Sequence, residues 1–330
     1  MAHTAPRTAA PRATPPPTAK EVAGDIGELV LGIEEDRREP AAAAGAGSEG
    51  ERVHRFHTAI DGSFSQGRTL FGGIGAALAF EAVHRALRAE RADAASVLSL
   101  RSILVCFAGP IFPGAIDARA KVLRAGKNIV TAEGKLEQQG GTRLALIANM
   151  GNAIRSSVAV APKAAKASKM PSRESVPDTP MPSPEFPTTS TFLAHLHVKW
   201  HTGIPMKRDV PNARRTAMWI RHRNLDFYRT SPTAALLAIA DVPPPIIMLH
   251  FDTVPNASSV TWFLEFVIDP RDVVATNPDG WFFLDYRLDS AKDGYSQQSG
   301  RIYAEDGRLV AYSRQSMVYY DPKPAAKGKL

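Results

Sequence analysis

The sequence contains a single cysteine among its 330 residues, which excludes an intramolecular disulfide framework and is typical of a reducing compartment. Because Cys106 lies in the apolar run Ile-Leu-Val-Cys-Phe, we expect a buried structural thiol rather than a nucleophile. The sequence also lacks any apolar run of the roughly 18 to 20 residues that a membrane-spanning helix needs. Together these absences favour a cytoplasmic globular protein without a membrane span.

Motifs for metal ions and nucleic acids are also missing. The net charge of +7 lies partly in the N-terminal tail and in residues 163–173, and the rest of the chain has no zinc-ligand spacing, RNA-binding signature or helix-turn-helix. His195, His197 and His201 could chelate a metal only from one face of a strand, and we expect them at the rim of the second domain's first strand. We therefore expect no metal, no cofactor and no nucleic-acid partner, whereas a phosphate-bearing small ligand would suit the mild positive charge.

Low-complexity composition divides the chain. Segments rich in Ala, Pro, Gly, Lys and Ser bury too little apolar surface to offset the entropy lost on ordering. The first twenty residues have no apolar core for a secretory signal, and their prolines oppose the amphipathic helix of a transit peptide, so we expect a disordered tail that contains one candidate helix at 21–35. The predicted division is a tail at 1–50, a domain at 51–160, a linker at 161–188, a second domain at 189–322 and a basic tail at 323–330.

The two predicted domains repeat one order of elements. The first begins with a strand candidate at 53–60, and the second with the His-rich run at 192–201 and a strand candidate at 216–224. An apolar helix follows in each, at 72–90 and at 231–241, where Ser231 can cap the helix and Pro232 fits its first turn. Long runs rich in strand residues follow each helix, at 100–114, 121–136 and 142–151 and at 258–270, 280–303 and 307–320. One buried helix wrapped by an antiparallel sheet, present twice, predicts an α+β fold made of two fused copies of a small domain.

Three stretches resemble a known family. They are Leu-Phe-Gly-Gly-Ile-Gly-Ala-Ala-Leu-Ala at the start of the first helix, Leu-Val-Cys-Phe-Ala-Gly-Pro-Ile-Phe-Pro-Gly on the next strand and turn, and Gly-Arg-Leu-Val-Ala-Tyr-Ser-Arg-Gln on the last strand. In this order and spacing they resemble the thioesterase II family of acyl-CoA thioesterases, over about residues 53–160 and 190–321. The resemblance implies a tandem (double) hotdog, each copy a long central helix wrapped by an antiparallel sheet. Such sheets commonly pair edge to edge, which is compatible with a homo-oligomer.

The resemblance also implies an activity and a site. The family hydrolyses the thioester of an acyl-CoA with water and without an acyl-enzyme, a reaction of lipid metabolism. Its Asp at the end of the second helix corresponds to Asp241, its Thr or Ser on the next strand to Ser259, and its Gln on the last strand to Gln315. Strict alternation would turn Ser258 inward instead, and a β-bulge at the start of the strand would reverse this, so the preference for Ser259 depends on the family spacing.

The residues themselves also favour Asp241 and Gln315. An acid at the tip of an apolar helix is costly unless it is hydrogen-bonded or functional, and the helix C-terminus raises its pKa, which suits a general base. Alternation turns Gln315 inward together with Leu309, Ala311, Ser313 and Met317. The alternatives are a solvated aspartate that ends the helix and an amide that bonds only to backbone.

Matching the two halves face for face pairs Leu144 with Leu309, and therefore Met150 with Gln315. Methionine cannot hold a water molecule, so we expect one site per chain. For substrate binding we expect Phe71, Gly72 and Gly73, because glycines allow close approach and a helix N-terminus offers N–H groups to an oxyanion or phosphate. The alternative is a tight strand-to-helix turn. Relatives often carry Gln after this glycine pair, where this chain has Ile74.

The predicted function is therefore hydrolysis of an acyl-CoA thioester by a water that Asp241, Ser259 and Gln315 activate. One alternative is a non-catalytic acyl-CoA-binding hotdog protein, which Ile74 and a serine in place of threonine would favour. The other is an enoyl-CoA hydratase or dehydratase, whose Asp-x-Asn-Pro-x-His motif is matched only by Ala-Thr-Asn-Pro-Asp-Gly-Trp at 275–281. That stretch lacks both the Asp and the His, and we interpret it as a turn.

Overall fold

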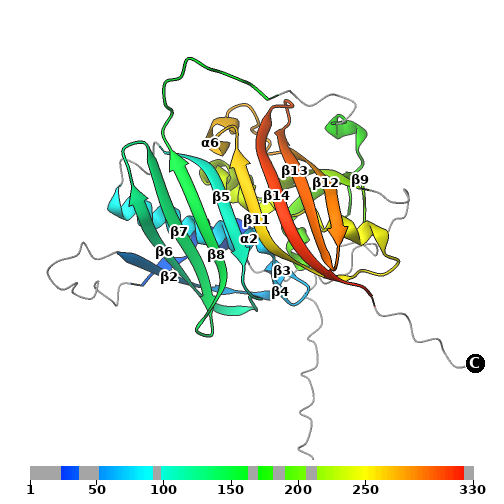
Figure 1. Cartoon of the computed structure of the whole chain (residues 1–330), viewed down its shortest axis with the longest axis horizontal. Coiled ribbons are helices and arrows are strands. Elements are labelled where there is room, and N and C mark those ends of the chain that lie inside the picture. The colour runs from blue at the N-terminus through cyan, green and yellow to red at the C-terminus, as the bar shows by residue number, and fades with distance from the viewer. Residues whose placement is uncertain are drawn as a thin grey trace, which may run out of the picture.

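An antiparallel sheet of 12 strands organises the described part of the chain, and Figure 1 shows it from its broad face. The computed structural model describes residues 24–36, 52–91, 98–162, 170–180, 190–205 and 214–322. The strands of the sheet are β1 (Glu34–Glu35), β2 (Val53–Ile60), β5 (Ser99–Phe107), β6 (Gly114–Ala125), β7 (Ile129–Gln138), β8 (Gly141–Gly151), β9 (Leu196–Thr202), β10 (Arg215–His222), β11 (Asn256–Phe266), β12 (Phe282–Lys292), β13 (Tyr295–Ala304) and β14 (Leu309–Tyr320). A separate small hairpin pairs β3 (Ser65–Gln66) with β4 (Thr69–Leu70).

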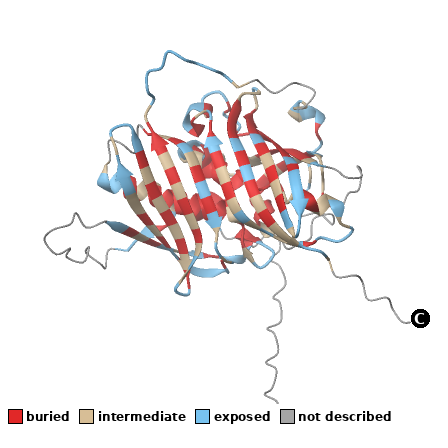
Figure 2. Ribbon diagram, viewed as in Figure 1, coloured by how far each residue is buried: buried red, intermediate tan, exposed pale blue. Residues whose placement is uncertain are grey.

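The strand order repeats on the two sides of the contact between β5 and β11. The order is β1-β2-β6-β7-β8-β5-β11-β14-β13-β12-β10-β9, so β8, β7, β6 and β2 lie outward from β5 as β14, β13, β12 and β10 lie outward from β11. Along the strands, buried residues alternate with more exposed ones, as the pale and red bands of Figure 2 show. One face of the sheet therefore covers the main core.

The helices are unequal in length. They are α1 (Ile26–Leu31), α2 (Gly72–Glu90), α4 (Leu225–Thr230), α5 (Pro232–Ala240) and α6 (Pro270–Val273), with short 3-10 turns η1 (Gly62–Phe64), η2 (Arg173–Ser175), η3 (Thr191–His195) and η4 (Ile246–His250). Helix α2 has the bounds expected from the sequence and packs against β6, β7, β8 and α5. None of the helices in these ranges combines the length and apolar character that a transmembrane span requires.

One expectation about a helix boundary was wrong, and one about a helix cap was met only in part. Where a helix was expected at 21–35, the described residues form only the six-residue α1, because a capping box between Asp25 and Glu28 starts it and Gly32 ends it, and β1 then pairs with β2. Ser231 occupies the N-cap position of α5, with Pro232 at its start, but its side chain makes no capping hydrogen bond within the described structure. Its backbone also ends α4 by donating to the carbonyl of Phe227, so it serves both helices.

Part of the predicted linker is packed rather than free of contacts. Val176 is only 3% exposed and belongs to a second apolar cluster with Trp219 and Trp281. Lys199 Nζ donates to the Val176 carbonyl at 3.0 Å, and Trp219 Nε1 donates to the Pro171 carbonyl at 3.2 Å. Residues 170–180 thus bury apolar surface, contrary to expectation, whereas 163–169 and 181–189 lie outside the described residues, as do most of the predicted N-terminal tail and the basic tail at 323–330.

The face of two residues was also predicted wrongly. Cys106 is exposed, because alternation turns its neighbour Val105 into the core and the thiol to the outer face of the sheet. Leu309 belongs to the second cluster, not to the inward face that Ala311 and Gln315 share. A register shift between β13 and β14 follows Leu309, and it reverses the face on which this residue lies.

The contact between β7 and α2 depends on Gly134. A Cβ at this position would lie 2.6 Å from the Ala79 carbonyl oxygen and 3.0 Å from a methyl of Val83. We predict that Gly134→Ala lowers the free energy of unfolding by about 1–3 kcal/mol, because the backbone of α2 must move. Denaturant unfolding checks this. Gly141→Ala, whose Cβ would make only ordinary contacts at 3.8 Å, is the control, and equal losses in both variants would contradict the prediction.

Candidate active site

Asp241, Ser259 and Gln315 come together through the amide of Gln315. Its Nε2 donates to Asp241 Oδ1 at 2.7 Å and to Ser259 Oγ at 2.9 Å. The three residues come from the end of α5, from β11 and from β14, and are separated by up to 74 positions in the sequence. A carboxyl, a hydroxyl and an amide therefore share one hydrogen-bonded cluster, and each was expected from the sequence.

Asp241 is the C-cap residue of α5 and lies against the start of α2. Burial raises the pKa of its carboxyl to about 7, while hydrogen bonds from Gln315 and from the backbone N–H of Gly73 lower it. The sequence predicted the direction of this change but assigned it to the dipole of α5, whereas removal from water is the main cause. The residue as a whole is of intermediate exposure, and a pKa of about 7 lets its carboxyl exchange protons near neutral pH.

A β-bulge decides which of the two serines belongs to this cluster. The pairing of β11 with β14 shifts between Ser259 and Thr261. Before the shift, the side chain of Ser259 points inward and bonds to Gln315. After the shift, Trp262 and Leu264 are the residues that point inward. Ser258 is exposed, and its hydroxyl donates to the Ser259 carbonyl at 3.3 Å.

The oxygen of the Gln315 amide accepts a hydrogen bond from a second glutamine. Gln298 on β13 is 2% exposed, and its Nε2 donates to Gln315 Oε1 at 3.0 Å. The backbone N–H of Ile246, after α5, donates to Gln298 Oε1 at 3.1 Å. Gln298 stands in the polar run Ser-Gln-Gln-Ser and was not among the predicted site residues, although alternation from Ile302 places it on the buried face.

A buried tyrosine anchors the helix end that carries Asp241. Tyr286 OH donates to the Ala240 carbonyl at 2.6 Å, and burial raises the pKa of this phenol, which stays protonated as a donor. Ser313 hydrogen-bonds to Tyr286 and accepts from Trp262 Nε1 at 3.0 Å. These contacts link the C-terminus of α5 to the strands that carry Ser259 and Gln315.

Gly72 and Gly73 allow α2 to approach Asp241. A Cβ on Gly72 would lie 2.6 Å from Asp241 Oδ2, and one on Gly73 would lie 2.7 Å from the Ala238 carbonyl oxygen. The N–H of Gly73 thus bonds to the carboxyl of Asp241, whereas the sequence predicted that it would bind a ligand. Phe71 is 1% exposed and stacks on Phe192 with ring centroids 3.8 Å apart, so its side chain belongs to the core.

The first half of the sheet has an apolar counterpart of this cluster. A similar bulge shifts the pairing of β5 with β8 between Leu100 and Ser102, and it places Leu100 opposite Met150 as Ser259 lies opposite Met317. Two pairs further along, Ala148 takes the place of Gln315, and its partner Ala132 on β7 takes the place of Gln298. The expected match of Met150 with Gln315 was therefore wrong by two residues. The match was counted from Leu309, which the bulge that follows it places on the opposite face of the sheet.

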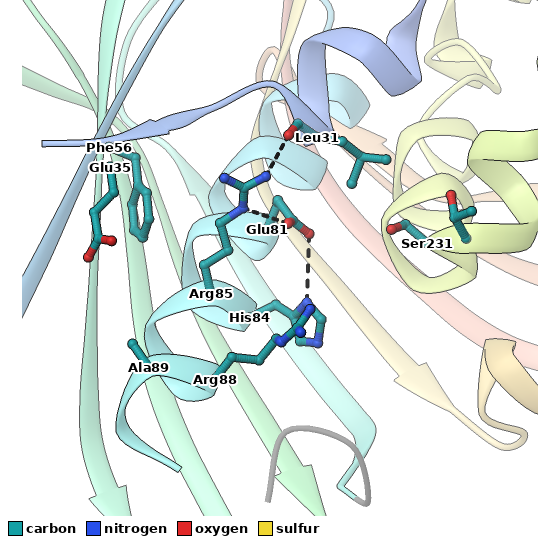
Figure 3. Close-up of a pocket in the computed structure, with 10 residues that line it drawn as sticks. Leu31, Glu35, Phe56, Glu81, His84, Arg85, Arg88, Ala89 and Ser231 are labelled. Carbon is teal, nitrogen blue, oxygen red and sulfur yellow. Dashed lines mark hydrogen bonds and ion pairs between the residues drawn. The ribbon is translucent and has the colours of Figure 1, made fainter. Parts of the chain in front are cut away.

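A cavity lies away from this cluster. It has a volume of about 440 Å³ and is bordered by the second half of α2, the segment 31–35 and the start of α5, as Figure 3 shows. Arg85 crosses it, donating to the carbonyls of Leu31 and Ile33 at 2.5 Å each and pairing with Glu81 at 2.9 Å. These contacts fasten the N-terminal segment to α2, and Asp241, Ser259 and Gln315 do not line the cavity.

His195, His197 and His201 do not all lie on one strand. His195 is buried in η3 and stacks on Phe64, so it does not lie at the rim of a strand as expected, whereas His197 and His201 are on the edge strand β9. Across the described ranges, no three His, Cys, Asp or Glu side chains gather as a metal site would require. Residues 275–281, which resemble the hydratase motif in part, lie between α6 and β12, where Asn277 Nδ2 donates to the Trp281 carbonyl at 2.8 Å.

Solved structures similar to this one define the class of fold. A hot dog fold protein of unknown function from Alicyclobacillus acidocaldarius has a TM-score of 0.67 and 20% identity, over 91% of this chain and 100% of that one. The tesB protein of Mycobacterium avium subspecies paratuberculosis has a TM-score of 0.61 and 15% identity, over 90% and 100%. An acyl-CoA thioesterase II of Mycobacterium marinum has a TM-score of 0.58 and 16% identity, over 90% and 99%. At these identities the similarity establishes a hotdog fold.

Sequence profiles define the family. Residues 60–151 match the acyl-CoA thioesterase N-terminal domain, and residues 173–319 match the acyl-CoA thioesterase C-terminal domain. The chain therefore belongs to the acyl-CoA thioesterase family, as the resemblance implied. A search among curated protein sequences finds no significant match.

The pKa of Asp241 predicts a pH-dependent stability. Its folded value of about 7 exceeds the ordinary value of 3.8, so between these pH values the folded state binds a proton that the unfolded state releases. The free energy of unfolding that this residue contributes should fall as the pH rises from 3.8 to about 7 and then stay constant. Asp241→Asn should lose this dependence, which denaturant unfolding across the pH range measures.

Asp279→Asn is the control for this titration, because it removes an exposed carboxyl from a turn. Its unfolding curve should keep the pH dependence of the parent. If the parent and Asp241→Asn changed in parallel with pH, Asp241 would not be the group that titrates.

Proposed function

We propose that this protein hydrolyses the thioester of an acyl-CoA, with a water activated by Asp241, Ser259 and Gln315 and without an acyl-enzyme intermediate. We further propose that the sheet is a tandem of two hotdog domains with one site per chain, in the second copy. The observation that carries the proposal is the pair of hydrogen bonds from Gln315 Nε2 to Asp241 and to Ser259, in a chain of the acyl-CoA thioesterase family.

The chemistry assigns a role to each group. Asp241, ionised at and above a pH of about 7, accepts a proton from water while the water oxygen attacks the thioester carbonyl carbon. The tetrahedral intermediate then collapses and the C–S bond breaks. The sulfur takes the proton that Asp241 received from water and leaves as the CoA thiol, with the free acid as the other product and Asp241 ionised again. Ser259 positions the water by donating its hydroxyl hydrogen to the water oxygen, and Gln315 fixes Asp241 and Ser259 around the water with its two N–H groups.

We place the thioester carbonyl near the start of α2. The first-turn N–H groups of a helix can stabilise an oxyanion, and this turn already contacts Asp241 through Gly73. The same proximity would hold the carbonyl carbon close to the activated water. The apolar residues Leu100, Ala132 and Ala148 leave the first half of the sheet without an equivalent polar cluster, which supports a single site.

The rival functions make different predictions for the same assay. A non-catalytic acyl-CoA-binding protein would bind acyl-CoA without releasing thiol. An enoyl-CoA hydratase would add water across a double bond and leave the thioester intact. The turn at 275–281 offers neither the Asp nor the His that a hydratase motif needs.

We predict that Asp241→Asn lowers kcat for thiol release from acyl-CoA by at least about a hundredfold, because the variant lacks the base. The parent's kcat/KM should rise with pH to a plateau, with a midpoint near the Asp241 pKa of about 7. A panel of acyl-CoAs of different chain length, with a thiol reagent as the readout, measures both. Unchanged rates in Asp241→Asn would contradict the mechanism, and release from none of the panel would favour the binding protein.

We predict that the two adjacent serines differ in effect. Ser259→Ala removes a hydroxyl bonded to Gln315 and should lower kcat by about tenfold, because one of the groups that position the water is lost. Ser258→Ala removes an exposed hydroxyl and should leave kcat unchanged. Steady-state kinetics on the best acyl-CoA compares them, and the reverse ranking would mean that the bulge does not place Ser259 in the site.

A further inference from the structure

We propose that Gln298 is a positioning residue that sets the orientation of the Gln315 amide, so that its N–H groups and not its oxygen face Asp241 and Ser259. The inference rests on the proposed function, because it assigns Gln298 to the same hydrolytic site. It concerns a residue that does not touch the water or the thioester and acts only through Gln315.

The orientation is determined in steps from the backbone. The N–H of Ile246 can only donate, so the atom of Gln298 that faces it at 3.1 Å must be the oxygen Oε1. Nε2 of Gln298 then points the other way and donates to Gln315 Oε1 at 3.0 Å. Because the oxygen of Gln315 is occupied, its Nε2 is the atom left for Asp241 at 2.7 Å and Ser259 at 2.9 Å.

The site groups alone would not hold this orientation through a catalytic cycle. An ionised Asp241 accepts only, but after it takes a proton from water it can donate, and the hydroxyl of Ser259 can donate at any stage. A Gln315 amide that turned over would satisfy both of these donors with its oxygen. Gln298 opposes the turn, because its own N–H would then face an N–H and the buried pair would lose a hydrogen bond.

Burial and register make Gln298 suited to this role. Gln298 and Gln315 are each 2% exposed, so solvent cannot replace a lost partner. They are direct cross-strand partners on β13 and β14, whereas the equivalent partners on β7 and β8 are Ala132 and Ala148. The first half of the sheet therefore lacks both amides, the counterpart of Gln315 and the counterpart of Gln298.

The decisive variant is Gln298→Glu. A carboxylate still accepts from the Ile246 N–H, but its second oxygen cannot donate to Gln315. The Gln315 amide should therefore turn, giving Nε2 to Glu and presenting Oε1 to Asp241. We expect kcat for acyl-CoA hydrolysis to fall by about tenfold to a hundredfold in the alkaline range, with KM within about twofold of the parent.

The pH profile gives a readout that a loss of structure would not. The N–H of Gln315 lowers the pKa of Asp241, and its replacement by a carbonyl oxygen should raise this pKa further. The midpoint of the kcat/KM profile should therefore move to higher pH in Gln298→Glu. Gln298→Met, which has a similar shape and no amide, should lower kcat but shift the midpoint less.

The first half of the chain offers a matched control. Gln138 is another buried glutamine, 8% exposed, that accepts from the Phe112 N–H at 2.9 Å and donates to the Phe112 carbonyl at 2.8 Å. Gln138→Glu disturbs a buried amide of the same kind without contact to Gln315. It should lower thermal stability while kcat and the pH midpoint remain those of the parent.

A spectroscopic measurement separates this inference from the proposed function. In protein labelled with ¹⁵N-glutamine, the side-chain amide resonance of Gln315, assigned from its loss in Gln315→Leu, should shift in Gln298→Glu and not in Gln138→Glu. Parental kcat, pH midpoint and Gln315 resonance in Gln298→Glu would overturn the role of Gln298. A parent that releases no thiol from any acyl-CoA would overturn the proposed function, while the resonance would still test the orientation.

Discussion

The close approach of α2 to the carboxyl end of α5 is the constraint on which the candidate site depends. Side chains at Gly72 or Gly73 would push the helices apart, since their Cβ atoms would lie 2.6 Å from Asp241 Oδ2 and 2.7 Å from the Ala238 carbonyl oxygen. The approach removes water from Asp241 and supplies the N–H of Gly73 in its place. The two effects oppose each other, and because burial dominates, the pKa of the carboxyl is raised to about 7 and not lowered.

The polar groups around Asp241 form a continuous network because each buried group needs a partner. Tyr286 holds the Ala240 carbonyl, Ser313 links this phenol to Trp262, and Gln298 connects Gln315 to the backbone of Ile246. An incomplete network would leave a buried donor or acceptor unsatisfied, at a cost of roughly 1–3 kcal/mol each. Stability and orientation of the site therefore depend on the same hydrogen bonds.

The two halves of the sheet share a bulge but differ in the side chain that it turns inward. Both halves carry a bulge near the start of their central strand, after Leu100 in β5 and after Ser259 in β11. The bulge brings an apolar side chain inward in the first half and a hydroxyl in the second. The same backbone geometry thus serves as packing on one side of the sheet and as part of the candidate site on the other.

The sequence by itself determined the bounds of α2, the inward face of Gln315 and the position of Asp241 at the end of an apolar helix. These follow from local periodicity and composition, which depend on neighbours along the chain. Only the tertiary structure decided that Ser259 and not Ser258 joins the cluster and that Cys106 faces outward. It also decided that Ala148 and not Met150 is the counterpart of Gln315, and that Gln298 hydrogen-bonds to Gln315. Each of these depends on a bulge, a strand register or a cross-strand pair, and a shift of one residue reverses the face of every side chain that follows.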